Sequence, residues 1–147
     1  MSHTLFSQKE IEYFMSQQLA RIATASTSSE EKSFLQPDVV PVSFDFDGEF
    51  FYIRGTSILK SIIYKNVLKN DKVAIVIDDL GGVDPPNPRG IRIYGNANIV
   101  SRQGGYMDQN LQHHYIRISP KKKWSWGIEE LMFANGRFNV RRATKKS

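Results

Sequence analysis

The residues most suited to binding a ligand lie at one junction, Arg-Gly-Thr-Ser-Ile-Leu-Lys, which spans residues 54–60. The run before it, Phe50–Ile53, is typical of a strand, and the apolar spacing after it predicts a helix over 57–69. The first amides of a helix have no internal partner and carry the positive end of the helix dipole, so they attract anions. The groups that would hold an anion are Arg54, Gly55, Thr56, Ser57 and Lys60. They predict a phosphate site, although an ordinary Ser or Thr helix cap beside a solvated lysine has the same sequence.

The net charge of +5 is distributed unevenly along the chain. Residues 117–147 contain nine Lys or Arg against Glu129 and Glu130, which gives +7 and leaves −2 for the rest of the chain. A basic end of this kind attracts a phosphorylated cofactor, a nucleic acid or an acidic lipid. A solvated tail without a partner explains the charge equally well.

Other arrangements that could support chemistry are weaker. Asp78 and Asp79 end an apolar run before Gly-Gly, where a carboxylate pair more often caps a turn than binds a metal. His113 and His114 are adjacent, so on a strand they face opposite sides and cannot chelate one ion. No spacing indicates a Ser-His-Asp arrangement, and we predict neither a metal site nor a catalytic side chain.

Length and composition bound the class of protein. With 147 residues, 40% of them hydrophobic, the chain fits one globular domain, which we assign to residues 1–147. No apolar run approaches membrane-spanning length, and the first residues lack the form of a secretory signal. The chain has no cysteine, which excludes disulfides and thiolate chemistry. We therefore expect a soluble, cytoplasmic protein that does not associate with a membrane.

Local patterns predict the elements that position the junction. Ser7 and Glu10 form a capping-box pattern that opens a short helix, with Ile11, Phe14 and Met15 on its apolar side. Strands are expected at residues 19–27, 39–46, 50–54, 72–79, 90–102 and 115–120, the last leading into Lys-Lys-Lys-Trp-Ser-Trp-Gly. Residues 27–38 and 80–90 are predicted loops. Mostly antiparallel strands with one helix inserted after the third indicate a mainly β fold, a closed or split barrel rather than an α/β sheet.

Two more specific predictions concern a hairpin turn and the burial of one strand. Asp47-Gly48 lies between the second and third strands and predicts a type I′ hairpin turn, which needs positive φ at both central residues. Residues 72–79 form a continuous apolar run, Lys-Val-Ala-Ile-Val-Ile-Asp-Asp, which predicts a central strand buried on both faces.

The order of these elements resembles a known family, the FMN-binding split-barrel superfamily of pyridoxamine 5'-phosphate oxidase-like proteins. Residues 19–27 are similar to its first strand, and residues 38–56 to its second and third. Residues 64–80 look like its helix-then-strand signature, with Asp71 where a proline is common. The remaining matches are residues 83–100, similar to a proline-bearing loop and fifth strand, and residues 115–127, similar to a last strand with a terminal Trp-Gly. The closest subgroup is the PPOX class dependent on coenzyme F-420.

The resemblance implies a six-stranded antiparallel split β-barrel that forms a homodimer, with FMN or F-420 in a groove at the dimer interface. The cofactor phosphate would sit at Arg54, Thr56, Ser57 and Lys60. The tricyclic ring would lie, mostly on backbone groups, along Arg21, Ile22, Ala23 and Thr24 and along Pro41, Val42 and Ser43. Trp126 and the basic tail could close the groove from the partner subunit. Small residues in a crowded barrel and a tryptophan in its core are the structural alternatives.

The chain departs from the family pattern in two places. Family helices often carry two basic residues where this chain has Ile62 and Ile63, and the match after Gly127 is weak. We therefore expect Lys121–Lys123 and the last few residues to be solvated. At most Arg137, Arg141 or Arg142 are expected to approach the cofactor.

Three functions are consistent with the sequence. The first is an oxidoreductase, a flavoprotein or deazaflavin enzyme that uses F-420 or FMN to transfer a hydride to a small organic substrate. The second is a non-catalytic flavin, deazaflavin or haem-type ligand-binding protein on the same barrel. The third is a nucleic-acid-binding barrel that stacks bases on Trp124 and Trp126, but no RNP or OB signature accompanies them. We expect the first function without a nucleic-acid partner, and the basic balance favours F-420, the more anionic cofactor.

Overall fold

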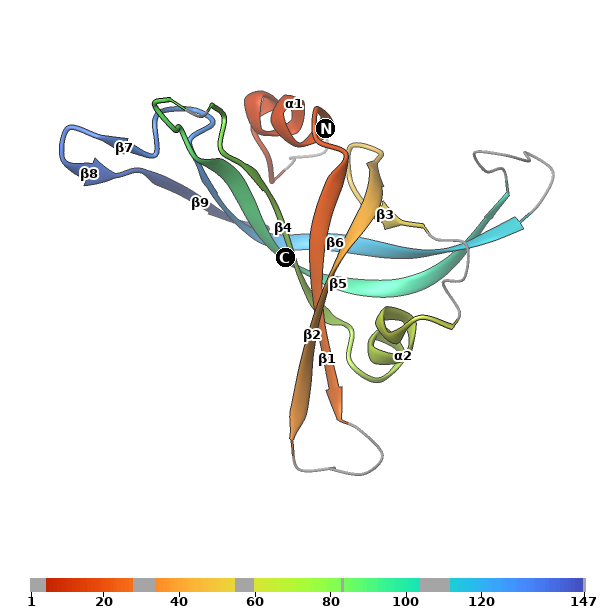
Figure 1. Ribbon diagram of the computed structural model, residues 1–147. Helices are drawn as coiled ribbons and strands as arrows, with labels where there is room; N and C mark the ends of the chain where they lie inside the picture. Colours follow the sequence, from red (N-terminus) through yellow and green to blue (C-terminus); the bar gives the residue numbers. More distant parts are fainter. Residues whose placement is uncertain (1–4, 28–33, 55–59, 83, 104–111, 147) are drawn as a thin grey trace.

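The computed structural model describes residues 5–27, 34–54, 60–82, 84–103 and 112–146, which form a mainly β fold (Figure 1). The helices in this part of the chain are α1 (Gln8–Met15) and α2 (Ile62–Lys69). The strands are β1 (Leu19–Thr27), β2 (Leu35–Phe46), β3 (Phe51–Ile53), β4 (Lys72–Asp79), β5 (Arg89–Gln103), β6 (Gln112–Trp126), β7 (Phe133–Ala134), β8 (Arg137–Phe138) and β9 (Val140–Thr144).

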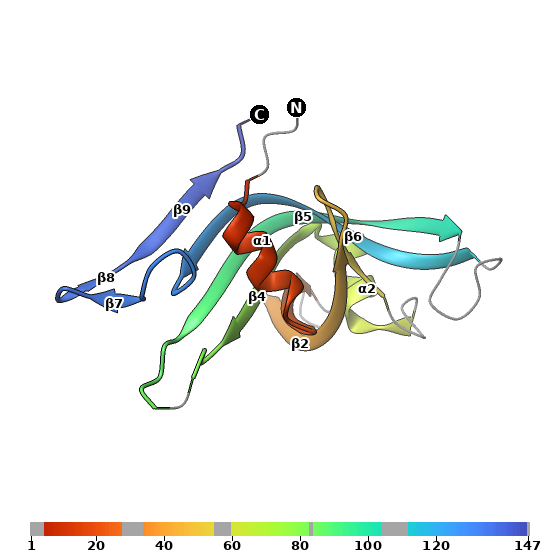
Figure 2. The ribbon, with the colours of Figure 1, turned by 90° about the horizontal axis from the view of Figure 1, so that it is seen from above.

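Six of these strands close into an antiparallel barrel. Their order is β3-β2-β1-β4-β5-β6, and a further pairing of β3 with β6 completes the ring. β9 pairs with the last part of β6, and the β7–β8 hairpin stands away from the barrel (Figures 1 and 2). The predicted split β-barrel with one helix after the third strand is confirmed. The three C-terminal strands were not predicted.

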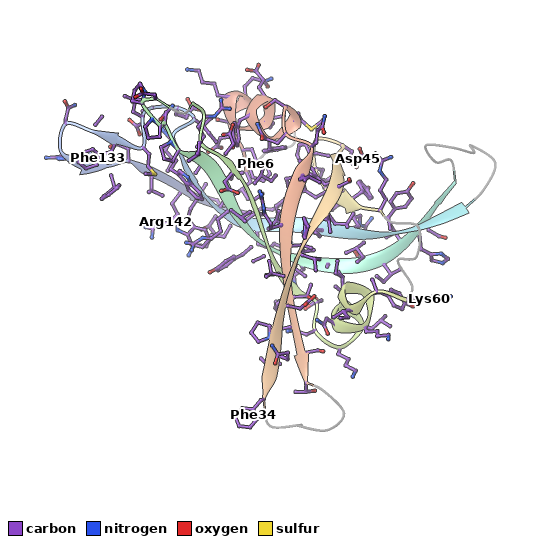
Figure 3. All side chains as sticks on the ribbon, in the orientation of Figure 1. Phe6, Phe34, Asp45, Lys60, Phe133 and Arg142 are labelled. Atoms are coloured by element: carbon purple, nitrogen blue, oxygen red, sulfur yellow. The ribbon has the colours of Figure 1, made fainter. Side chains whose placement is uncertain are left out.

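The barrel core forms from the inward face of each strand. Isoleucines dominate it, with Ile22 on β1, Ile75 on β4 and Ile93 on β5 all almost fully buried. At the end covered by α1, Phe6 and Phe14 meet edge to face at 5.2 Å between ring centroids. Figure 3 shows Phe6 between α1 and the strands. Aromatic contacts of this geometry stabilise the packing of a helix on a barrel end beyond their buried area.

Helix α1 begins as predicted. The Ser7 side chain accepts from the Glu10 amide, and the Glu10 carboxylate accepts from the Ser7 amide at 2.8 Å, which completes the capping box. The buried face differs from the prediction, because Met15 is 52% exposed and Tyr13 is buried in its place. The apolar side of so short a helix cannot be assigned from spacing alone when the position of the barrel beneath it is unknown.

The β2–β3 hairpin is present, but its turn is not type I′. Gly48 has a φ of 104°, whereas Asp47 is not among the residues with positive φ. The Asp47 carboxylate instead accepts from the amides of Glu49 and Phe50 at 2.9 and 2.8 Å, which stabilises a longer turn. β2 also begins at Leu35, so the last third of the predicted loop 27–38 belongs to a strand.

Helix α2 begins later than predicted. Its N-cap is Ser61, whose hydroxyl accepts from the Tyr64 amide at 3.1 Å, so the cap is neither Thr56 nor Ser57. Lys60 therefore precedes the cap instead of lying one turn inside the helix. Its buried apolar side chains are Ile63 and Val67, whereas Ile62 is 59% exposed.

β4 is buried on one face only, which corrects the expectation of a strand covered on both sides. Val73, Ile75 and Ile77 point into the core, while Ala74 and Val76 lie half-buried on the outer face. No helix in the described part of the chain has the length and apolarity needed to cross a membrane. The outer face that β4 shares with its neighbours is where the candidate site lies.

Candidate functional site

The outer face of the barrel is organised in rows of directly opposed residues. Strand register joins β2, β1, β4, β5, β6 and β9 into a continuous surface. One row is Val39, Ala23, Ala74, Tyr94, Lys122 and Thr144. The neighbouring row is Pro41, Arg21, Val76, Arg92, Trp124 and Arg142. The first row is small and apolar in its middle, and the second is aromatic and basic toward β9.

A groove of about 670 Å³ follows the first row. Its floor consists of alanines, with Ala23 and Ala25 on β1 and Ala74 on β4. Tyr94 on β5 forms a wall and remains 47% exposed. A groove of this size with an apolar floor can accept a small organic molecule. Its mouth is basic, because its charged lining residues in the described part of the chain are Lys72, Lys121, Lys122 and Lys145.

A β-bulge in β6 creates this basic mouth. Tyr94 pairs with Lys122 and Gly95 pairs with Pro120, so Lys121 is an extra residue on β6. Gly95 is required there, because a Cβ atom at this position would lie 2.6 Å from the Ser119 carbonyl oxygen. A bulge re-aims side chains, and here both Lys121 and Lys122 line the groove although they are adjacent in sequence.

The wall of the groove is braced by stacked side chains. The Tyr94 and Trp124 rings meet edge to face at 4.8 Å. The Arg92 guanidinium lies 4.0 Å from the Trp124 ring centroid, and the Lys122 ammonium lies 4.9 Å from it. These cation–π contacts hold Tyr94 and Lys122 in place at the groove.

The predicted ring contacts alternate along β1 and β2, so some of their side chains face outward and others face the core. Arg21 and Pro41 are paired in the register and point outward, as do Ala23 and Ser43. Ile22 is 1% exposed and Val42 packs against the core, so these two offer only backbone groups to the outside. Of the predicted ring contacts, Ala23 and Thr24 line the groove.

Backbone groups are available on β2 rather than on β1. β1 lies between β2 and β4, so its amides and carbonyls are used in two ladders. β3 pairs with β2 only at Phe44–Phe46, and among the described strands none lies beside the Leu35–Ser43 edge. An unpaired strand edge presents the donors and acceptors that a flat heterocycle can use.

Two further predicted contacts have structural roles. The Thr24 hydroxyl accepts from the Asn66 side-chain nitrogen Nδ2 at 2.9 Å, and the Ser26 hydroxyl donates to the Asn66 side-chain oxygen Oδ1 at 2.6 Å, which ties α2 to β1 in the interior. The Trp126 ring covers Gly90, where a Cβ atom would lie 2.6 Å from it. Trp126 is not among the described residues that line the groove.

The predicted phosphate site is only partly described. Gly55, Thr56 and Ser57 lie outside the described residues. Arg54 follows β3 and forms an ion pair with Asp45 at 3.7 Å. Lys60 is exposed just before the α2 cap, and Figure 3 shows it beside α2, across the β1–β2 ribbon from Arg142. Neither Arg54 nor Lys60, the two described residues of the predicted anion site, lines the groove.

The carboxylates that end β4 are both paired. Asp79 accepts from Arg89 at 2.9 and 2.7 Å and from the Tyr13 hydroxyl at 3.0 Å. The hydrogen bonds from Arg89 hold the pKa of Asp79 below its usual range. Burial, together with Asp79, raises the pKa of Tyr13 far above that of an ordinary phenol. Asp78 pairs with Arg21 at 3.0 Å. This cluster fastens α1 to the barrel end.

The sequence interpretation missed the buried role of one lysine. Lys123 was expected to be solvated, but its side chain is 7% exposed and pairs with the fully buried Glu10 carboxylate. Ser125 donates to the same Glu10 oxygen. The bulge at Lys121 turns Lys123 inward, and Gly95 within an alternating strand was the available signal for that bulge.

The comparisons with known proteins agree with this barrel. Residues 7–127 match the family described as pyridoxamine 5'-phosphate oxidase. This chain belongs to that family. A 5a,11a-dehydrotetracycline/5a,11a-dehydrooxytetracycline reductase of Streptomyces rimosus is 37% identical over 126 residues, which cover 84% of either chain. Family membership and this relative support an oxidoreductase of the pyridoxamine 5'-phosphate oxidase-like class.

Solved structures show the same fold at low sequence identity. The FAD binding protein from Mycobacterium smegmatis has a TM-score of 0.58 and 16% identity, covering 97% of this chain and 99% of its own. An F-420 reductase has a TM-score of 0.51 and 20% identity, covering 72% and 88%. At these identities the neighbours show that the fold is shared.

Proposed function

We propose that the protein is a homodimeric oxidoreductase of the PPOX class that uses F-420 or FMN to reduce a carbon–carbon double bond in a small organic substrate. The observation that carries this proposal is the outer face, where the alanine-floored groove lies beside the β2 edge that no described strand pairs with. A redox enzyme needs a cofactor and a substrate side by side, and this face offers adjoining surfaces for both. The cytoplasm, where reduced cofactors are regenerated, is the compartment that we propose.

The outer face fits a tricyclic ring. Ala23 and Pro41 are small or flat at the surface, so a ring can lie close to the strands. The β2 edge from Leu35 to Ser43 supplies backbone donors and acceptors for the heteroatoms of the ring. Bound F-420 or FMN in its reduced form supplies a hydride. The role of the protein's own residues is to bind the ring, to hold the substrate against it and to exclude water.

The cofactor phosphate is proposed to bind between Arg54 and the start of α2. Lys60 stands exposed before the cap, and the first amides of α2 add the positive end of a helix dipole. Asp45 neutralises part of the Arg54 charge. Lys60 is therefore the stronger charged anchor of the two.

The reaction class is suggested by the Streptomyces rimosus relative, whose name describes a reductase of dehydrotetracyclines. A hydride added to an electron-poor double bond sends the electron pair to a conjugated carbonyl oxygen, and a proton from water completes the reduction. Because water supplies this proton, the proposal requires no side chain of the outer face to act as a general acid. A non-catalytic flavin, deazaflavin or haem-type carrier on the same surface is the second candidate, favoured by that same lack of an obligatory catalytic side chain.

The apolar residues on the outer face support the proposed homodimer. Val39 on β2 is 65% exposed, Leu19 on β1 is 48% exposed, and Val140 on β9 is 53% exposed. Exposed apolar side chains gathered on one sheet face are typical of a protein interface. Sedimentation that returned a single 16.8 kDa species at micromolar concentration would contradict the dimer.

A spectroscopic titration tests the proposed cofactor. The purified protein is titrated with F-420 and with FMN, and binding is followed by absorbance and fluorescence of the cofactor. Lys60→Ala should weaken binding by about 1–3 kcal/mol, the scale of a charge-assisted hydrogen bond. Lys69→Ala is the matched control, because Lys69 is an exposed lysine at the other end of α2. Equal affinity of Lys60→Ala and the control would remove Lys60 from the site.

A further inference from the structure

We infer that the lysine-rimmed groove is the substrate subsite, and that it accepts a flat molecule with an apolar body and an anionic edge, such as an aromatic carboxylate or a phenolate. The identification of the ligand as a substrate rests on the proposed function. The ligand class follows from the groove alone, and three features carry it.

The floor selects a flat, apolar body. Ala23 and Ala74 are paired across β1 and β4, and Ala25 follows Ala23 on the same face of β1. Pro37 adds a rigid apolar edge on the β2 side. Tyr94 provides an aromatic wall that can contact a ring at its edge or face. A compact tetrahedral anion such as phosphate would leave this floor uncovered.

The rim selects negative charge. Lys121, Lys122 and Lys145 converge on the groove from the β6 bulge and from the end of β9. The Lys145 amide donates to the Lys121 carbonyl at 2.7 Å, which fixes the end of the chain against the bulge. Lys72 on the opposite side has an aspartate within reach, Asp71 at 4.0 Å. Because no described carboxylate lines the groove, its described rim is a net positive site for the anionic edge of a ligand.

The position of the groove distinguishes substrate from cofactor. It shares Ala23 and Thr24 with the surface proposed for the ring, so a bound molecule would lie next to the cofactor. It does not include Arg54 or Lys60, where the cofactor phosphate is proposed. A ligand held in the groove therefore needs no phosphate group, and its anionic edge meets the lysines on the side away from the β2 edge.

Binding of a simple probe tests the inference without cofactor or turnover. Calorimetry measures the affinity of the wild-type protein for 2-naphthoate, and 2-naphthamide serves as the neutral probe of the same shape. We expect 2-naphthoate to bind more tightly than the amide and to lose affinity with added salt. Lys121→Gln/Lys122→Gln should weaken naphthoate binding about tenfold and leave amide binding nearly unchanged. Ala74→Phe, which fills the floor, should abolish binding of both probes.

Control variants and a second titration separate the outcomes. Lys69→Gln removes an exposed lysine from α2 and should bind both probes as the wild type does. Equal naphthoate affinity in the double lysine variant, or unchanged binding in Ala74→Phe, overturns the groove as the site. Displacement of naphthoate by F-420 or FMN overturns the substrate assignment, since the groove would then hold the cofactor. Naphthoate binding with no cofactor binding overturns the proposed function and supports the ligand class of the groove.

Discussion

Neighbouring lysines on the two faces of β6 lie in opposite environments. On the inner face Lys123 is buried and pairs with Glu10, while on the outer face Lys121 and Lys122 line an open groove. A buried ammonium must have a partner, because leaving water costs several kcal/mol per ion. An ammonium group at the mouth of a groove stays hydrated, so it needs no partner within the protein and can bind a ligand. The same residue type thus serves structure on one face and recognition on the other.

The difference depends on one extra residue. Without the bulge, strict alternation would place Lys121 on the same face as Lys123. The bulge shifts the register between Tyr94 and Gly95, and three consecutive lysines then divide two to one between the faces. The backbone geometry of the bulge therefore separates the two groove lysines from the buried Lys123.

The largest predicted effect comes from breaking the inner pair. Lys123→Ala leaves the fully buried Glu10 carboxylate without its cation and should lower the free energy of unfolding by about 3–5 kcal/mol. Chemical denaturation measures this change. The double variant Glu10→Leu/Lys123→Met replaces the pair with apolar side chains and should recover most of the loss. A double variant as unstable as Lys123→Ala would show that packing, and not the unpaired charge, dominates the site.

The second prediction concerns the bulge. Gly95→Ala places a Cβ atom 2.6 Å from the Ser119 carbonyl oxygen, so β5 and β6 must move apart. The free energy of unfolding should fall by about 1–3 kcal/mol, as for an overpacked core position. The control is Gly82→Ala, where the nearest atom to the new Cβ is the Pro85 oxygen at 3.5 Å. If Gly95→Ala leaves stability unchanged, the glycine is not what maintains the bulge.

A third prediction tests the cluster that joins α1 to the strand ends. The pKa of Asp79 is lowered in the folded state by Arg89, so this carboxylate stabilises the fold above its ordinary pKa and loses that contribution as pH falls. Asp79→Asn should cost about 1 kcal/mol at pH 7, a value reduced because both side chains are about one-third exposed. Its unfolding free energy should then decline less steeply than that of the wild type between pH 5 and pH 3, as denaturation at several pH values would show.

The matched control for this cluster is Asp78→Asn. Its ion pair with Arg21 is exposed on both sides, so about 0–1 kcal/mol is expected at pH 7. Parallel pH profiles for Asp79→Asn and the wild type would contradict a role for Asp79 in acid stability.

Sequence patterns predicted the barrel because its strands alternate clearly. The bounds of β1 were predicted to the residue, and the capping box of α1 was recognised from Ser7 and Glu10. The start of α2 was misplaced, because Thr56, Ser57 and Ser61 are all acceptable caps and only tertiary contacts select Ser61. The β7–β8 hairpin was missed although Asn135-Gly136, with φ values of 55° and 72°, is a strong turn signal.

The site was harder to predict than the fold. Small residues on β1 indicated a surface for close approach, and Ala23 does lie in the groove. Ala74, Tyr94 and the lysines come from strands far apart in sequence, so only the register brings them into one row. A run of three lysines has no visible division between faces until the bulge is known.

The smallest predicted effect completes the comparison of the lysines. Lys122→Ala removes a partly exposed ammonium and its contact with the Trp124 ring at 4.9 Å. A cation–π contact of this kind contributes about 0.5–1 kcal/mol, so the free energy of unfolding should change by no more than that. Removal of the next lysine along the strand is expected to cost several times as much. Measured under one set of conditions, a similar loss for Lys122→Ala and Lys123→Ala would mean that Lys122 also serves the fold. It would then not be free to bind a ligand at the groove.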